Sequence, residues 1–169
     1  MRKCIFLDRD GVLNEEIGRY VWKVTEFVIR PGIIEMLKYY KQKGYLLIVI
    51  TNQGGIARGQ FTHAEVKTCH AYFQQQAGYL IDAFYYSPYQ VSHSASLSSK
   101  PGSLLFEKAI AKFNIDISQS WMIGDKARDI IPAQKLGIKT IRLITPEEDE
   151  DKIADYVITD LEAIRNIII

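Results

Sequence analysis

Short apolar runs alternate with amphipathic segments along this chain of 169 residues. Each apolar run has the length of a β-strand and is bounded by polar or turn-forming residues, which is the usual signature of a strand. The run Tyr45–Thr51 is apolar almost throughout, as is typical of a parallel strand covered on both faces. The runs predict strands over Lys3–Leu7, Tyr45–Thr51, Ala83–Ser87, Ser120–Gly124, Ile138–Ile144 and Tyr156–Ile158.

Segments with helical periodicity separate these strands. In Thr62-His63-Ala64-Glu65, the threonine and the glutamate have the spacing of a capping box, which marks the start of a helix. Pro132 favours a helix that starts near Asp129, because proline suits the first turn of a helix. Helices are predicted over Pro31–Lys43, from Thr62 onward, and over Gly102–Phe113, Asp129–Leu136 and Asp160–Asn166.

This alternation of strands and helices predicts an α/β fold. We expect a three-layer, doubly wound parallel sheet that forms a single domain over residues 1–169. No internal repeat and no linker marks a second domain.

The composition is that of an ordinary soluble globular protein, with 47% hydrophobic and 24% charged residues. A net charge of +1 gives no reason to expect a nucleic acid or a membrane as a partner. Cys4 and Cys69 are too few for a disulfide framework, which suits a reducing cytoplasm. We see no signal peptide and no apolar segment of the roughly 20 residues needed to span a bilayer. A cytoplasmic monomer or weak dimer is expected.

Polar residues that could bind a ligand follow four of the predicted strands. In an open α/β sheet, ligands bind beyond the carboxyl ends of the strands. Polar residues after one strand are ordinary, whereas acidic, basic and hydrogen-bonding residues after four strands together indicate a ligand-binding site. The residues are Asp8 and Asp10 after the first strand, Thr51 and Asn52 after the second, Lys100 after the third, and Asp125, Lys126 and Asp129 after the fourth.

The pair Asp8 and Asp10 requires a compensating positive charge, because two carboxylates held this close repel each other. Together with Asp125 they offer the hard oxygen ligands that suit Mg²⁺. A phosphate dianion could not approach these carboxylates unaided. The cation would screen them, and Lys100 would supply a second positive charge.

A bound phosphate would also meet Thr51 and Asn52, whose side chains can donate hydrogen bonds to phosphate oxygens. Asp8 lies nearest the rigid strand and is therefore the better-placed nucleophile, which would form an aspartyl-phosphate intermediate. Asp10 could protonate the leaving oxygen and then deprotonate the attacking water. The sequence thus predicts hydrolysis of a small phosphorylated metabolite.

Four motifs, "DRDGVLN", "TNQGGIARG", "KPG" and "GDKARD", resemble in this order the motifs of the haloacid dehalogenase (HAD) superfamily of phosphatases. Their longer forms are similar to the branch of histidinol-phosphate phosphatases and D-glycero-D-manno-heptose 1,7-bisphosphate phosphatases. The resemblance covers nearly the whole chain and implies a phosphatase. It ranks a sugar phosphate such as a heptose bisphosphate first as the substrate, and histidinol phosphate second. The interval Asn14–Pro31 is too short for a cap domain, so no large cap is expected.

The resemblance also implies a role for individual residues. Asp8 would be the nucleophile and a metal ligand, Asp10 the general acid/base with its main-chain oxygen toward the metal, and Asp125 the residue that completes the metal site. Asn14 would shape its loop, and Arg58 would lie near the substrate entrance. The other implied members are Thr51, Asn52 and Lys100 around the phosphoryl group, and Lys126 and Asp129 near the metal.

The loop before Lys100 departs from this branch, in which cysteines and a histidine often bind structural zinc. Serine stands at the cysteine positions, at Ser87, Ser96 and Ser98. Hydroxyl groups do not replace thiolates on zinc, so structural zinc is not expected and the loop must rely on hydrogen bonds and packing. Ser99 stands where an arginine is usual and where the substrate would be recognised outside its reacting phosphate.

Two other functional classes stay open at this point. A non-catalytic regulatory protein that binds phosphate could carry such an altered loop, although all the catalytic residues are present. A receiver-type signalling domain also uses a phosphoaspartate on a parallel sheet, but it lacks a second aspartate two positions later, which makes Asp10 the discriminating residue. Asp129 fits two roles equally well, as a member of the site or as the N-cap of its helix.

Overall fold

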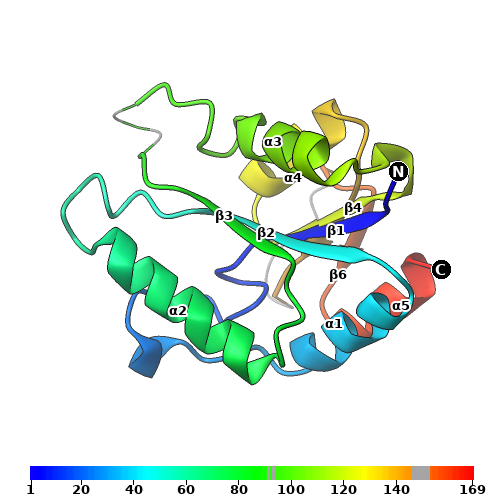
Figure 1. Ribbon diagram of the computed structural model, residues 1–169, viewed down its shortest axis with the longest axis horizontal. Coiled ribbons are helices and arrows are strands. Elements are labelled where there is room, and N and C mark those ends of the chain that lie inside the picture. Colours follow the sequence, from blue (N-terminus) through cyan, green and yellow to red (C-terminus); the bar gives the residue numbers. More distant parts are fainter. Residues whose placement is uncertain (91, 93, 146–152) are drawn as a thin grey trace.

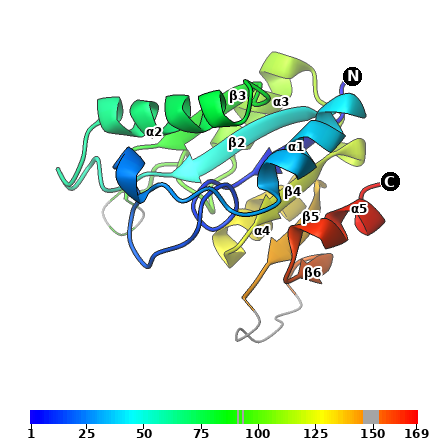
Figure 2. The ribbon, with the colours of Figure 1, turned by 90° about the horizontal axis from the view of Figure 1, so that it is seen from below.

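The computed structural model describes residues 1–90, 92, 94–145 and 153–169. Six strands in this part of the chain form one sheet in the order β3-β2-β1-β4-β5-β6 (Figure 1, Figure 2). Every neighbouring pair is parallel, as the continuous apolar runs predicted. The strands are β1 (Cys4–Leu7), β2 (Leu46–Asn52), β3 (Ala83–Ser87), β4 (Trp121–Gly124), β5 (Lys139–Leu143) and β6 (Tyr156–Ile158).

Helices cover both faces of the sheet and complete the predicted three layers (Figure 1). One face carries α3 (Leu104–Phe113) and α4 (Ala127–Lys135). The other carries α1 (Ile33–Gln42), α2 (His63–Gln76) and α5 (Ile164–Ile167). Single turns of 3₁₀ helix, η1 to η3, lie at Val24–Glu26, Ile117–Gln119 and Leu161–Ala163.

The alternation of side chains along β1 builds the two halves of the core. Ile5 and Leu7 belong to the cluster under α1 and α2, whereas Cys4 and Phe6 belong to the cluster under α3 and α4. All four are fully buried. The Phe6 and Phe106 rings pack edge to face, with 5.2 Å between the ring centres. Burial of one large apolar side chain contributes about 1.5–3 kcal/mol, so the central strand is fixed from both sides.

The start of α2 is as predicted, but the start of α4 is not. Thr62 and Glu65 form the predicted capping box at the start of α2. The predicted start of α4 near Asp129 is wrong, because the helix begins at Ala127 and Pro132 lies well inside it. The Asp129 carboxylate accepts a hydrogen bond from the main-chain N–H of Lys126 at 3.0 Å. This contact satisfies a free donor at the start of the helix, so α4 begins two residues before the position that proline alone suggested.

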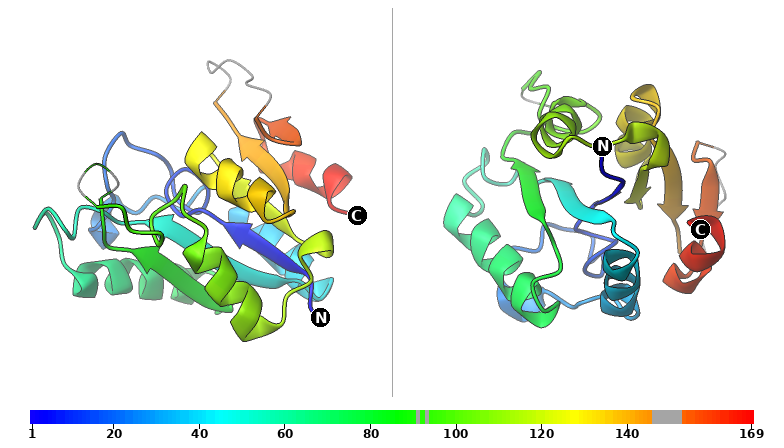
Figure 3. Two further views of the ribbon diagram at one scale, coloured as in Figure 1. Left: turned by 90° about the horizontal axis from the view of Figure 1, so that it is seen from above. Right: turned by 45° about the vertical axis from the view of Figure 1, so that its right-hand side comes forward.

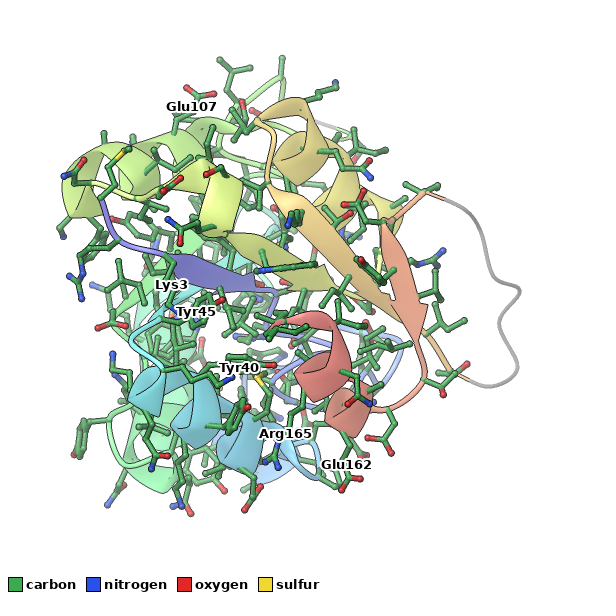
Figure 4. All side chains as sticks on the ribbon, turned by 90° about the vertical axis from the view of Figure 1, so that its right-hand side faces the viewer. Lys3, Tyr40, Tyr45, Glu107, Glu162 and Arg165 are labelled. Carbon is green, nitrogen blue, oxygen red and sulfur yellow. The ribbon has the colours of Figure 1, made fainter. Side chains whose placement is uncertain are left out.

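The end of the described chain is held against α1. The Tyr40 hydroxyl lies 3.0 Å from the carbonyl oxygen of Ile164 and 3.2 Å from that of Ile168, and shares its proton between them. Arg165 on α5 lies over the ring of Tyr39, 4.8 Å from its centre. Figure 4 labels Tyr40 on α1 and Arg165 on α5. No helix among the described residues is long and apolar enough to cross a membrane.

Candidate active site

The carboxyl ends of β1, β2 and β4 lie on the side of the sheet opposite to the start of the chain (Figure 3). Asp8 follows β1 directly, and its main-chain N–H donates to the carbonyl of Ile123 in β4 at 3.0 Å. This bond extends the pairing of the two strands by one residue. It therefore fixes the first aspartate beside the segment that carries Asp125.

Three of the predicted residues form a buried carboxylate cluster, made of Asp8, Asp125 and Asp129. One oxygen from each lies within 4.8 Å of the others, and their exposed fractions are 2%, 6% and 0%. Burial, and then the charges of Asp8 and Asp129, raise the pKa of Asp125 to about 7. Burial and the Asp8 charge likewise raise the pKa of Asp129. Burial and mutual repulsion thus disfavour the ionised forms of Asp125 and Asp129.

Lys100 pairs with two carboxylates of this cluster. Its Nζ lies 2.8 Å from Asp8 Oδ1 and 2.6 Å from Asp129 Oδ1, and it donates to the carbonyl of Ile50 at 2.7 Å. Burial alone would lower the pKa of Lys100, but the two carboxylates hold it above its ordinary value. This ammonium group thus contacts two of the three carboxylates and leaves Asp125 without a contact to it.

The Asp125 carboxylate fits an additional cation. Its Oδ1 atom is buried and has no hydrogen-bond partner among the described residues. Its other oxygen, Oδ2, lies 3.4 Å from Lys126 Nζ. An unpartnered carboxylate oxygen beside two further carboxylates is the donor set that Mg²⁺ prefers.

Asp129 lies in the carboxylate cluster and is not the N-cap of its helix, which is Lys126. It is the third residue of α4, and one oxygen caps the first turn while the other meets Lys100. Gly124 makes this possible, since a Cβ at that position would overlap the side chain of Asp129. Gly11 has the same relation to Asp125, and it also adopts a left-handed φ of +89°.

The side chain of Asp10 lies in a separate hydrogen-bond network at the wall of the cavity. Arg9 Nη2 donates to both carboxylate oxygens at 2.9 Å, and Asn14 Nδ2 donates to Oδ1 at 3.0 Å. Gln53 Nε2 donates to Oδ2 at 2.9 Å and lies 3.1 Å from Thr51 Oγ1. Asn14 therefore holds Asp10 directly, beyond its predicted part in shaping the loop.

The sequence assigned no role to Arg9 or Gln53, although both lie within the motifs quoted above. Both are fully buried, and Arg9 also donates to the carbonyl of Val21. The only local signal was a charged residue between two aspartates, which is equally compatible with a surface turn. The contact of Gln53 with Asp10 joins residues 43 positions apart, and no spacing rule reveals it.

Asn52 contacts the main chain of Lys100 from the end of β2. Its Oδ1 accepts the N–H of Lys100 at 2.9 Å, and its Nδ2 donates to the Lys100 carbonyl at 2.9 Å. This two-point contact fixes the lysine from which the buried ammonium group extends. The predicted phosphate contact would have to use the remaining N–H of the same amide.

A cavity of about 790 Å³ opens next to Asp8 and Asp10. It brings together residues from the loops after β1, β2 and β4, among them the predicted Arg58 and Lys126 and the unpredicted Arg128. Tyr20, Trp22 and Phe61 supply aromatic surface, and the Trp22 and Phe61 rings stack at 6.3 Å. The remaining lining residues are Glu16, Gly18, Arg19, Thr51, Asn52 and Gln60.

Ser99 lies away from this cavity. It is buried, its hydroxyl lies 2.7 Å from Ser87 Oγ, and it donates to the carbonyl of Tyr89 at 3.0 Å. Ser99 lines neither this cavity nor an adjoining one of about 390 Å³ that Lys100 and Tyr89 line, so the geometry does not support its predicted contact with the substrate. Ser98 Oγ lies 2.9 Å from Ser87 Oγ and 2.8 Å from Ser96 Oγ, which confirms that hydrogen bonds hold the loop.

Known proteins give this geometry a family. A family model described as HAD-hydrolase-like matches residues 98–164. The D-glycero-beta-D-manno-heptose-1,7-bisphosphate 7-phosphatase of Haemophilus ducreyi is 35% identical, over 95% of this chain and 94% of that protein. The chain belongs to this family of HAD phosphatases. The protein of the same name from Escherichia coli K12 is 34% identical to this HAD phosphatase, over 94% of this chain and 89% of that protein.

Solved structures agree with this placement at the level of the fold. The D,D-heptose 1.7-bisphosphate phosphatase from B. bronchiseptica, complexed with magnesium and phosphate, matches with a TM-score of 0.86 and 23% identity. The match covers 98% of this chain and 97% of that chain. The present chain therefore has the HAD phosphatase fold, and the relatives and family model named above make it a hydrolase. The two alternatives, a receiver domain and a non-catalytic regulator, do not fit this family.

Proposed function

We propose that this HAD phosphatase is a Mg²⁺-dependent phosphomonoesterase that acts on a phosphorylated sugar through a phosphoaspartate at Asp8. A heptose 1,7-bisphosphate is the candidate substrate, because the relatives described above are named for it and align with nearly the whole of this chain. The observation that carries the mechanism is the buried carboxylate cluster, with its unpartnered Asp125 oxygen, at the edge of a cavity. We propose that residues 1–169 act as a single phosphatase domain.

The metal would be held by Asp8, Asp125 and the main-chain carbonyl of Asp10. When bound, Mg²⁺ would offset the negative charge of these carboxylates and of the incoming phosphate. Asp129 supports this arrangement indirectly, because it binds Lys100, which in turn binds Asp8. Lys126 adds a positive charge beside Asp125. We propose no zinc in the serine loop, where hydroxyl groups meet one another.

The reaction would proceed in two displacements. In the first, an Asp8 carboxylate oxygen attacks the phosphorus, the ester P–O bond breaks, and Asp10 donates a proton to the leaving sugar oxygen. In the second, Asp10 takes a proton from a water molecule whose oxygen attacks the phosphorus. The bond to Asp8 then breaks and inorganic phosphate leaves.

Residues around the cluster would bind and orient the transferred phosphoryl group. Thr51 is buried, and the Gln53 side-chain amide links its hydroxyl to the Asp10 carboxylate. Lys100 would contribute its ammonium group. Asn52 would position Lys100 through the two main-chain hydrogen bonds described above. Arg58, exposed on the cavity wall, would meet the part of the substrate that does not react.

Replacement of the nucleophile tests this function. Asp8→Asn is isosteric but removes the attacking charge, so the purified variant should fold normally and lose detectable phosphate release from D-glycero-D-manno-heptose 1,7-bisphosphate in Mg²⁺ buffer. Asp160→Asn is the control, because Asp160 is an exposed cap residue that asparagine replaces well. Substantial turnover by Asp8→Asn would exclude Asp8 as the nucleophile. Absence of turnover by the wild type would exclude this substrate.

A further inference from the structure

Four cationic side chains line the larger cavity: Arg19, Arg58, Lys126 and Arg128. Two of them have protein partners. Arg19 donates to Glu26 Oε2 at 2.8 Å and to Oε1 at 3.1 Å, which uses the guanidinium group in a two-point contact. Lys126 lies 3.4 Å from Asp125. Their positive charges are therefore partly committed to neighbouring carboxylates.

Arg58 and Arg128 differ from this pair. Neither guanidinium group makes a hydrogen bond or an ion pair with another residue in the part of the chain that the structure describes, and both residues are exposed. They come from separate elements, Arg58 from the loop after β2 and Arg128 from the first turn of α4. Two guanidinium groups thus face one cavity with their donors available to a ligand.

Arg128 has a further property that Arg58 lacks. It also lines the second cavity, of about 390 Å³, together with Tyr20 and Asn52, which are shared by both cavities. The two cavities therefore adjoin at Arg128. A ligand that reaches Asp8 with one end could contact this arginine with another part of the same molecule.

We infer that Arg58 and Arg128 form a second anion site, and that Arg128 selects substrates carrying a second phosphate group. The inference rests on the proposed function and deepens it. A guanidinium group binds phosphate through two parallel N–H donors, so it gives direction as well as charge. The Asp8 end of the cavity, by contrast, would accept any phosphate monoester.

A simpler role for Arg128 is to balance the carboxylate cluster at longer range. Burial alone would lower the pKa of Arg128, but the charges of Asp129, Asp8 and Asp125 raise it above its ordinary value. A charge-balancing role would affect every substrate equally, whereas a second anion site affects only substrates with two anionic groups. The comparison of two matched substrates therefore separates these roles.

The test uses D-glycero-D-manno-heptose 1,7-bisphosphate and the corresponding 7-phosphate with Arg128→Gln. KM for the bisphosphate should rise on the order of 10–100-fold, the effect of one lost charge-assisted contact, with a much smaller rise for the 7-phosphate. Arg58→Gln should likewise raise KM for the bisphosphate more than KM for the 7-phosphate. Arg128→Lys keeps the positive charge and should restore part of the preference for the bisphosphate. Arg165→Gln removes the same charge on α5, outside both cavities, and should leave both KM values unchanged.

Equal changes for the two substrates in Arg128→Gln would overturn the second anion site. A wild type that hydrolyses neither substrate would instead overturn the proposed function. In that case binding still decides the inference. Calorimetry on Asp8→Asn with Mg²⁺ should show that adding Arg128→Gln weakens binding of the bisphosphate more than that of the 7-phosphate. Equal weakening there also overturns the second anion site.

Discussion

Gly11 shows how tightly single residues fit around the carboxylate cluster. Its φ of +89° is strained for any residue with a side chain, and a Cβ there would overlap the Asp125 carboxylate. Gly32 has a φ of +80° but nothing within 4 Å of the position a Cβ would take. The two glycines therefore separate the effect of backbone strain from the effect of moving Asp125.

Gly11→Ala should lose both stability and activity, whereas Gly32→Ala should lose stability alone. Each substitution should destabilise the fold by about 1–2 kcal/mol through the left-handed backbone. Only Gly11→Ala displaces Asp125, so only this variant should bind Mg²⁺ more weakly and release less phosphate from nitrophenyl phosphate. Urea unfolding and a Mg²⁺ titration measure the two effects. Equal activity in the two variants would contradict the role of Gly11.

Single residues were predictable where strand geometry places them. Asp8 and Asp125 follow apolar strands, so the rule that sites lie at strand ends was sufficient to find them. Arg9 and Arg128 stand in the same motifs, but their roles depend on which neighbour each meets in space. Arg9 meets Asp10 and the carbonyl of Val21, while the guanidinium group of Arg128 has no protein partner within hydrogen-bond or ion-pair distance in the described part of the chain. Sequence spacing contains neither fact.

At the scale of the elements, apolar pattern predicted the strands better than turn chemistry predicted the helix starts. Strands depend on burial, which the pattern reports directly. The start of α4 depends on which side chain reaches a free N–H, and the Asp129 contact with Lys126 outweighed the preference of Pro132 for a first turn. The capping box at Thr62 was predictable because both of its partners are local in sequence.

The contact between α2 and β3 contains a buried histidine that gives the fold a pH dependence. His70 on α2 stacks on Phe84 of β3 at 4.5 Å, and its Nε2 has no hydrogen-bond partner in the described residues. Burial, and then the charge of Arg9, lower the pKa of His70 to about 3. The unfolded chain thus binds this proton more readily than the folded one, so stability should fall as the pH drops below 6.5.

We expect His70→Phe to flatten this acid dependence. At pH 5 the wild type should lose about 2 kcal/mol relative to pH 7 through His70, and the variant should be spared that loss. Urea unfolding at pH 7 and pH 5 measures the difference. His63→Gln is the control, since His63 is exposed and should leave the dependence unchanged. An identical acid dependence in wild type and His70→Phe would show that His70 is not the responsible group.

At the scale of the whole molecule, the site joins segments that are far apart in sequence. Its carboxylates follow β1 and β4, and its ammonium group lies between β3 and α3. A cation bound there therefore links separate parts of the sheet, and its binding energy adds to the stability of the whole fold. Without it, mutual repulsion of the buried carboxylates opposes folding.

Asp125→Asn should separate these two contributions. In metal-free buffer at pH 8 the variant should melt at a higher temperature than the wild type, because one buried charge is gone. Mg²⁺ at about 100 times its dissociation constant should stabilise the wild type by about 2.7 kcal/mol, which corresponds to roughly 5–10 °C for a chain of this size. The variant should show little of this shift, and Asp160→Asn should keep it in full. Thermal unfolding with and without chelator measures both effects. The cation does not bind at this cluster if Mg²⁺ leaves the melting temperature of the wild type unchanged, or if Asp125→Asn keeps the full shift.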